Sequence, residues 1–122
     1  MSVYSGDIEV NDNDFYMKFE RFIVRDKELS FNILGDDEFG DFTLEGVATK
    51  LPNGEYRADT KVIYSSYKSN KEDDQSTVSI IIDSVVESSN QASCLVKGRW
   101  LENQDTWKFQ GEIEKFSKVQ IQ

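Results

Sequence analysis

Residues 92–116 decide the fold, and they read A-S-C-L-V-K-G-R-W-L-E-N-Q-D-T-W-K-F-Q-G-E-I-E-K-F. Apolar and small side chains alternate with polar ones on both sides of a polar turn, which is the period of two expected of a half-buried β-strand. The residues that share the apolar face are Ala92, Cys94, Val96, Gly98, Trp100, Trp107, Phe109, Gly111 and Ile113. The stretch therefore predicts one complete β-hairpin with a single buried face.

The same alternation recurs along most of the chain. It predicts further strands at residues 3–10, 29–33, 42–48, 56–64 and 78–82. The Pro52-Asn53-Gly54 turn is the strongest turn signal, because proline presets φ and Asn-Gly accepts the positive φ values of a tight hairpin. Residues 65–76 are polar without any aliphatic interruption and predict a long mobile loop, and a last short edge strand is predicted at residues 119–121.

Residues 15–24 fit two patterns. The odd-numbered positions from 17 to 23 alternate as in a strand, whereas positions 15, 19, 22 and 23 have the spacing of an amphipathic helix. We favour a strand, because residues 29–33 follow a short polar turn and alternate as its return strand. On this register Arg21 points inward, where it could pair with a ligand carboxylate. A slip of one residue would expose it instead.

About eight strands joined by short turns make an antiparallel meander. A meander of this length has to curl or close to bury its apolar face and remove its edges. Gly46, Gly98 and Gly111 lie in the middle of strands and mark where the sheet bends or where an aromatic ring lies over backbone, with Trp100 and Trp107 as the expected covers. We therefore predict an all-β fold in which the 122 residues form one domain, a closed or half-open small barrel.

In architecture the chain resembles the calycins, the small barrels that include lipocalins, fatty-acid-binding proteins and avidins. The resemblance rests on the length of the meander, the glycine-bearing strands and the placement of the tryptophans. It implies a barrel whose interior binds a small apolar ligand. The G-x-W segment that opens lipocalins is missing, since Gly6 is followed by Asp7 and Ile8, so no binding residue is carried over from that family.

The composition limits the chemistry. The chain has no histidine, which is the commonest general base and transition-metal ligand. Cys94 is the single cysteine, so no intrachain disulfide can form, and on an apolar strand face it is expected to be buried. The acidic turns lack the ordered pattern of a calcium loop, and there is no phosphate-binding loop or nucleophile elbow. We predict no catalytic residue, no cofactor, no metal and no enzymatic activity.

The charge is strongly negative and unevenly distributed. The chain has 23 acidic and 14 basic residues, a net charge of −9, and residues 1–61 hold 14 of the acids and seven of the bases. Such a surface repels phosphate backbones and anionic membranes. The N-terminus has no signal-like segment, and no apolar run is long enough to span a bilayer. We therefore expect a cytoplasmic protein that binds neither nucleic acid nor membrane.

Three functions stay open, and the one we favour is a non-catalytic acidic module that docks a basic protein, as an inhibitor, immunity protein or accessory subunit would. Complementary charge would mainly raise its association rate. The candidate contact residues are Asp36, Asp37, Glu38, Asp41, Tyr67 and Lys68. Such a module would be a monomer, or a homodimer paired through the edge at residues 119–121.

The alternative is a binder of a small apolar ligand inside the barrel. Its candidate residues are Arg21, Tyr56, Tyr64, Trp100 and Trp107. The bulky inward side chains argue against it, because eight strands enclose a space that side chains can just fill. The second alternative is a carboxylate-dependent hydrolase, which would need two acids buried in one cleft with raised pKa values.

Overall fold

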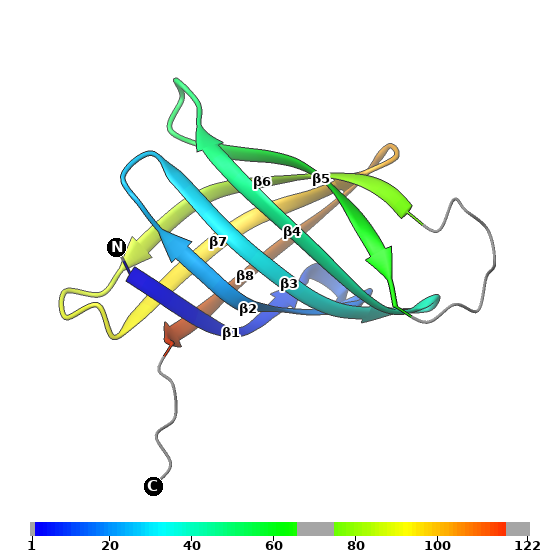
Figure 1. Cartoon of the computed structure of the whole chain (residues 1–122), viewed down its shortest axis with the longest axis horizontal. Coiled ribbons are helices and arrows are strands. Elements are labelled where there is room, and N and C mark those ends of the chain that lie inside the picture. Colours follow the sequence, from blue (N-terminus) through cyan, green and yellow to red (C-terminus); the bar gives the residue numbers. More distant parts are fainter. Residues whose placement is uncertain (1, 66–74, 117–122) are drawn as a thin grey trace, which may run out of the picture.

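The computed structural model describes residues 2–65 and 75–116. Within them the chain forms eight antiparallel strands and one short 3-10 helix (Figure 1). In chain order these elements are β1 (Ser2–Val10), η1 (Asn11–Asn13), β2 (Tyr16–Val24), β3 (Glu28–Asp37), β4 (Gly40–Lys50), β5 (Tyr56–Tyr64), β6 (Gln75–Glu87), β7 (Ser93–Glu102) and β8 (Asp105–Lys115). No helix in these ranges is long and apolar enough to cross a membrane.

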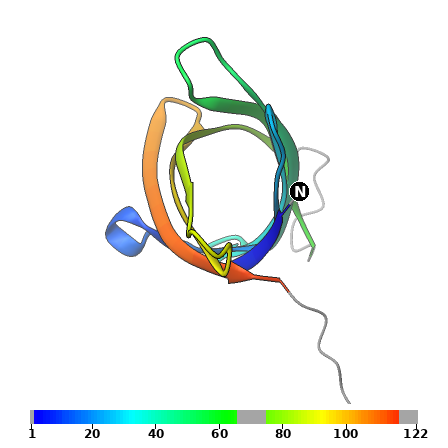
Figure 2. The same cartoon turned by 90° about the vertical axis from the view of Figure 1, so that its left-hand side faces the viewer.

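The strands close into a barrel. Each pairs antiparallel with the next in sequence, and β1 also pairs with β8, so that the sheet formed by the described strands has no open side (Figure 2). The predicted all-β meander of about eight strands is confirmed, and of the two predicted forms the barrel is the closed one. The hairpin of residues 92–116 consists of β7 and β8, which pair from Ser93 opposite Glu114 to Glu102 opposite Asp105.

The strand boundaries follow the predictions with one correction. Residues 16–24 form a strand, as favoured over the helix. The predicted loop at residues 65–76 is too long, because β6 begins at Gln75 and its polar first residues already pair with β5. Tyr67, Lys68 and the edge predicted at residues 119–121 lie outside the described residues, so a homodimer through that edge stays a prediction.

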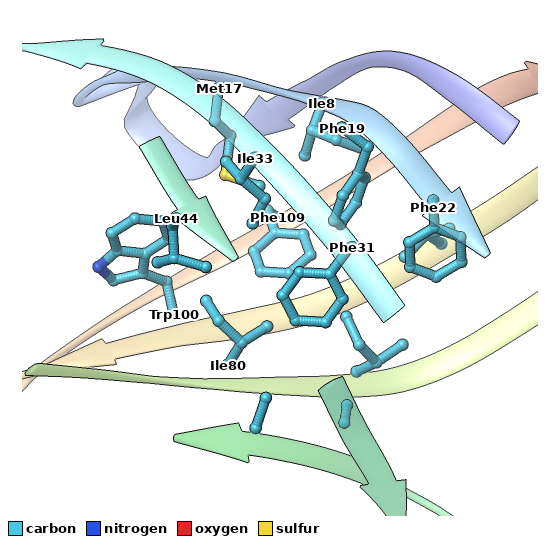
Figure 3. Packing of buried hydrophobic residues seen from close by; sticks show 14 of the residues in the cluster. Ile8, Met17, Phe19, Phe22, Phe31, Ile33, Leu44, Ile80, Trp100 and Phe109 are labelled. Atoms are coloured by element: carbon cyan, nitrogen blue, oxygen red, sulfur yellow. The ribbon is translucent and has the colours of Figure 1, made fainter. Parts of the chain in front are cut away.

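Aromatic side chains occupy the middle of the barrel (Figure 3). Phe19, Phe22, Phe31 and Phe109 are each at most 3% exposed, and the ring centroids of their contacting pairs lie 4.7 to 6.4 Å apart. These separations are typical of offset and edge-to-face packing. Buried aliphatic side chains from all eight strands surround the rings: Ile8, Val10, Met17, Leu29, Ile33, Leu44, Val62, Val78, Ile80, Ile82, Val96 and Ile113.

A β-bulge in β2 corrects the predicted orientation of Arg21. Phe19 pairs with Ile33 on β3 and Arg21 pairs with Asn32, so two residues of β2 advance while β3 advances by one. Glu20 is therefore an extra residue, and it shifts the alternation of inward and outward side chains by one. Phe22 therefore points inward. Arg21 is exposed, and its guanidinium carbon lies 5.7 Å from the centroid of the Phe116 ring. The inward register is wrong, and the alternative that exposes Arg21 is correct.

Phenylalanine rings cover two of the three strand glycines that the sequence singles out, Gly98 and Gly46. A Cβ added at Gly98 would lie 2.5 Å from the Phe109 ring and 2.5 Å from the carbonyl oxygen of Ile81. A Cβ at Gly46 would lie 3.1 Å from the Phe31 ring, a contact that a small movement of the ring relieves. At Gly98 the backbone of β7 therefore lies closer to Ile81 and Phe109 than a residue with a side chain would allow.

We expect Gly98→Ala to lower the free energy of unfolding by about 1–3 kcal/mol, because the added methyl group overpacks against backbone that cannot move independently. Gly46→Ala is the matched control and should change it by less than about 1 kcal/mol, since the ring can shift and alanine also restricts the unfolded chain. Urea denaturation of both variants measures the difference. Equal losses at the two positions would contradict the close approach at Gly98.

Candidate functional site

One end of the barrel carries a pocket. The connections β1–β2, β3–β4 and β7–β8 all turn at this end, away from the N-terminus, because successive hairpins of a meander turn at opposite ends (Figure 1). The pocket has a volume of about 410 Å³, within the range usual for small-molecule sites. We call it the mouth pocket, and its lining residues are Asp14, Phe15, Asp37, Glu38, Phe39, Tyr64, Trp100, Glu102, Asn103 and Trp107.

Phe15 lies at the centre of the aromatic part of this lining. It precedes β2, and its ring centroid is 4.9 Å from that of Trp100 and 5.9 Å from that of Trp107. The two tryptophans are directly opposite each other in the β7–β8 ladder. The prediction that they cover Gly98 and Gly111 is therefore wrong, because their register places them at the barrel end, beyond both glycines.

The aromatic cluster joins the mouth pocket to the barrel core. Phe42 is 2% exposed, and its ring centroid lies 6.2 Å from Phe15, 5.7 Å from Trp100 and 5.9 Å from Tyr64. Phe39 lies at the β3–β4 turn with 66% of its surface exposed, 6.3 Å from the Tyr64 ring centroid. The pocket therefore has an apolar floor that is continuous with the core and a rim that is open to solvent.

Three carboxylates accept hydrogen bonds from the polar edges of the aromatic residues. Trp107 Nε1 donates to Asp14 Oδ2 at 2.7 Å, and Trp100 Nε1 donates to Glu102 Oε1 at 3.0 Å. These bonds satisfy the indole N–H groups, which usually need a partner where a tryptophan packs into a protein. They also hold the ring planes in fixed orientations.

Tyr64 completes the set of aromatic–carboxylate pairs. Its hydroxyl donates to Asp37 Oδ2 at 2.6 Å, and Asp37 Oδ1 accepts from the backbone N–H of Phe39 at 2.8 Å. Burial raises the pKa of Tyr64, and the hydrogen bond to Asp37 raises it further. Tyr64 is therefore a neutral donor at physiological pH, and the β3–β4 turn is tied to the end of β5.

The structure brings residues from both predicted sets into the mouth pocket. Tyr64, Trp100 and Trp107 come from the ligand-binding set, and Asp37 and Glu38 come from the partner-binding set. The other described members of the two sets are not part of the lining. Asp36 and Asp41 are exposed on the same hairpin, Tyr56 is half-buried at the opposite end of the barrel beneath Lys50 Nζ, and Arg21 is on the outer surface.

Five lining residues were not predicted from the sequence: Asp14, Phe15, Phe39, Glu102 and Asn103. All five lie in or beside connections between strands, where the period of two gives no information. A signal was present at Phe15 and Phe39, since large aromatic side chains are unusual next to Asp-rich turns.

At the opposite end of the barrel a tyrosine hydroxyl is buried against a carboxylate. Tyr4 is fully buried, and its hydroxyl donates to Glu87 Oε2 at 2.5 Å. Burial raises the pKa of Tyr4 to about 12, with a further contribution from Glu87. Cys94 is 1% exposed, and burial likewise raises the pKa of its thiol to about 12. Cys94 is thus a poor nucleophile, as the sequence analysis expected of a buried thiol.

The described residues offer little for metal or carboxylate chemistry. No group of three or more cysteine or acidic side chains within residues 2–65 and 75–116 is arranged to hold a metal ion. No charged side chain in this part of the chain is buried, so the hydrolase hypothesis gains no support. A larger hollow of about 720 Å³ lies mainly on the outer face of β1, β7 and β8, and its lining is mostly polar, with Tyr16 as its one aromatic residue.

A comparison with solved structures finds the same fold. The barrel is similar to the crystal structure of bovine odorant binding protein complexed with its natural ligand, with a TM-score of 0.58 and 13% sequence identity. The similarity covers 98% of this chain and 72% of the bovine chain. No protein-family model matches the sequence, and a comparison with curated proteins finds no match. The fold is thus a lipocalin-like closed barrel.

We expect the protein to lose stability as the pH rises from 9 to 12. Because folding raises the pKa values of Cys94 (ordinarily 9.0) and Tyr4 (ordinarily 10.0), the folded state retains protons that the unfolded chain releases. Their contribution to stability is complete below pH 9 and is lost through about pH 12. In urea denaturation, Tyr4→Phe should show a shallower fall of the midpoint between pH 10 and 12 than the wild type. An unchanged slope would contradict the raised pKa of Tyr4.

Proposed function

We propose that this protein is a non-catalytic binder of small apolar molecules and that the ligand occupies the mouth pocket. The observation that carries the proposal is the composition of that pocket, in which five of ten lining residues are aromatic. Small-molecule sites are concave and combine apolar or aromatic surface with fixed polar groups, and the lining of this pocket is divided evenly between aromatic and polar residues. Because packed phenylalanine rings fill the barrel below the pocket, a ligand has room at the mouth of the barrel and not along its axis.

The fold likeness supports the same class of function. The bovine structure is that of an odorant binding protein with its natural ligand, so a barrel of this shape accommodates a small molecule in that protein. At 13% identity the likeness extends to the fold alone, and the ligand class for this chain rests on its own side chains.

The uncharged fluorescent probe N-phenyl-1-naphthylamine should bind at a single saturable site. Its fluorescence should rise on leaving water, and the emission of Trp100 and Trp107 should change because both rings line the pocket. Trp107→Leu should weaken binding about tenfold, since it removes one wall of the aromatic cluster.

Tyr56→Leu is the matched control, because it removes a half-buried aromatic ring at the opposite end of the barrel. It should leave the affinity for the probe unchanged. Binding that is lost equally in both variants, or no saturable binding to the wild type, would contradict a ligand site at the mouth.

A second candidate function is docking of a basic protein on the acidic β3–β4 turn. The observation that favours it is Phe39, which is 66% exposed between Glu38 and Gly40 in a turn that also carries Asp36, Asp37 and Asp41. An exposed aromatic side chain surrounded by charges of one sign has the composition of an interface hot spot with a charged rim. The net charge of −9 would steer a basic partner toward it.

Phe39→Ser should abolish retention of a specific basic partner in affinity capture from the source cell, and added salt should reduce retention by the wild type. Val47→Ser is the control, because Val47 is 54% exposed on the outer face of β4, away from the acidic turn. A partner that both variants retain equally, or whose yield is insensitive to salt, would count against this function.

A further inference from the structure

The polar contacts of the mouth pocket have a uniform chemistry. In each of three pairs, an aromatic side chain turns its N–H or O–H edge toward a carboxylate: Trp107 to Asp14, Trp100 to Glu102 and Tyr64 to Asp37. Glu38 adds a fourth carboxylate to the lining. Trp100 is 2% exposed, so its ring faces are already covered. Because carboxylates engage the ring edges, the faces of the half-buried Trp107 and Tyr64 are the part left to contact a ligand.

No basic side chain lines this pocket among the described residues. The ion pairs of the described chain lie elsewhere: Arg25 pairs with Glu28, Arg57 with Asp59, and Arg99 with Glu55 and Asp83. The four pocket carboxylates are therefore not neutralised by a described lysine or arginine. Their combined field makes the mouth favourable for positive charge and unfavourable for a carboxylate or phosphate ligand.

From these two features we infer that the mouth pocket selects a small organic cation, an ammonium group attached to an apolar body. The ammonium group is attracted by the ring faces of Trp107 and Tyr64, and among aromatic side chains tryptophan binds cations best. The surrounding carboxylates add long-range attraction, and the apolar body contacts Phe15 and the floor above Phe42. This inference rests on the proposed function and names the ligand class for the same site.

The geometry distinguishes this ligand from a metal ion and from a neutral molecule. A metal ion needs several converging ligand oxygens, and no such group is found in the described residues. A neutral apolar molecule would use the rings but would leave four carboxylates at the rim without a role in binding. An organic cation uses both the rings and the charges.

The experiment compares three ligands of similar size as competitors of N-phenyl-1-naphthylamine. They are phenyltrimethylammonium, its neutral isostere tert-butylbenzene, and the anion benzenesulfonate. The cation should compete at least about tenfold more strongly than the neutral isostere, and the anion should not compete. Raising the salt concentration should weaken competition by the cation and leave competition by the neutral isostere unchanged.

A matched pair of double variants assigns the preference to the pocket. Asp14→Asn with Glu38→Gln removes two exposed pocket charges while keeping side-chain size and the acceptor for Trp107. Asp26→Asn with Glu45→Gln removes two exposed charges outside the pocket. The first double variant should reduce the affinity for phenyltrimethylammonium about tenfold and leave the affinity for tert-butylbenzene unchanged. The second should leave the affinity for tert-butylbenzene unchanged and should lower the affinity for phenyltrimethylammonium only slightly, because it lowers the net negative charge without changing the pocket.

Each outcome has a distinct meaning. Equal competition by cation and neutral isostere, or equal losses in the two double variants, overturns the cation preference while the apolar-binding function stands. If neither ligand competes and the probe itself does not bind, the proposed function fails together with this inference. In a two-dimensional NMR spectrum, the two indole N–H signals should both shift with phenyltrimethylammonium, because both tryptophans line the site.

Discussion

Closure of the sheet between β1 and β8 is the constraint on which the rest of the structure depends. The ladder runs from Tyr4 opposite Lys115 to Val10 opposite Phe109 and gives the first and last described strands the partners that an open sheet would lack. Closing eight strands requires strong curvature, which the bulges in β2 and β6 and the close approach of backbone at Gly98 provide. The resulting interior is narrow. Four phenylalanine rings occupy its middle, and the mouth pocket lies at one end.

The strands could be predicted from the sequence because one-sided burial leaves a period of two in almost every one of them. Where the prediction failed, the cause was a feature that alternation does not encode. Glu20 is an extra residue in β2, and the only trace of it is the spacing of three between Phe19 and Phe22. The ring over Gly98 belongs to Phe109, its partner on the neighbouring strand. That assignment needs the register between strands, which a single strand's sequence does not contain.

The candidate site was predictable in its parts but not in its assembly. The sequence predicts an acidic surface around residues 36–41 and, as a separate set, aromatic residues that include Tyr64, Trp100 and Trp107. In a closed meander the β3–β4 and β7–β8 turns meet at the same end, so the two sets are neighbours. Phe15 and Phe39, which link them, lie beside turns, where hydrophobic pattern has no predictive value. The assembly follows from the antiparallel meander, which places every second turn at the same end, and from closure, which brings these turns around one mouth.

The two ends of the barrel differ in how their aromatic side chains are exposed. Both ends pair an aromatic hydroxyl or indole with a carboxylate, as Tyr4 does with Glu87 and Tyr64 does with Asp37. The hydrogen bonds alone therefore indicate only that a buried polar edge needs a partner. The difference lies in the rings: Tyr4 is fully buried, whereas Tyr64 and Trp107 are half-buried and Phe39 is largely exposed. Tyr56 and Phe116 are also half-buried at the opposite end, but within the described residues it is at the mouth that partly exposed rings gather around a pocket. Exposed aromatic surface costs free energy in water, and this gathering of rings is the physical argument for the proposed site.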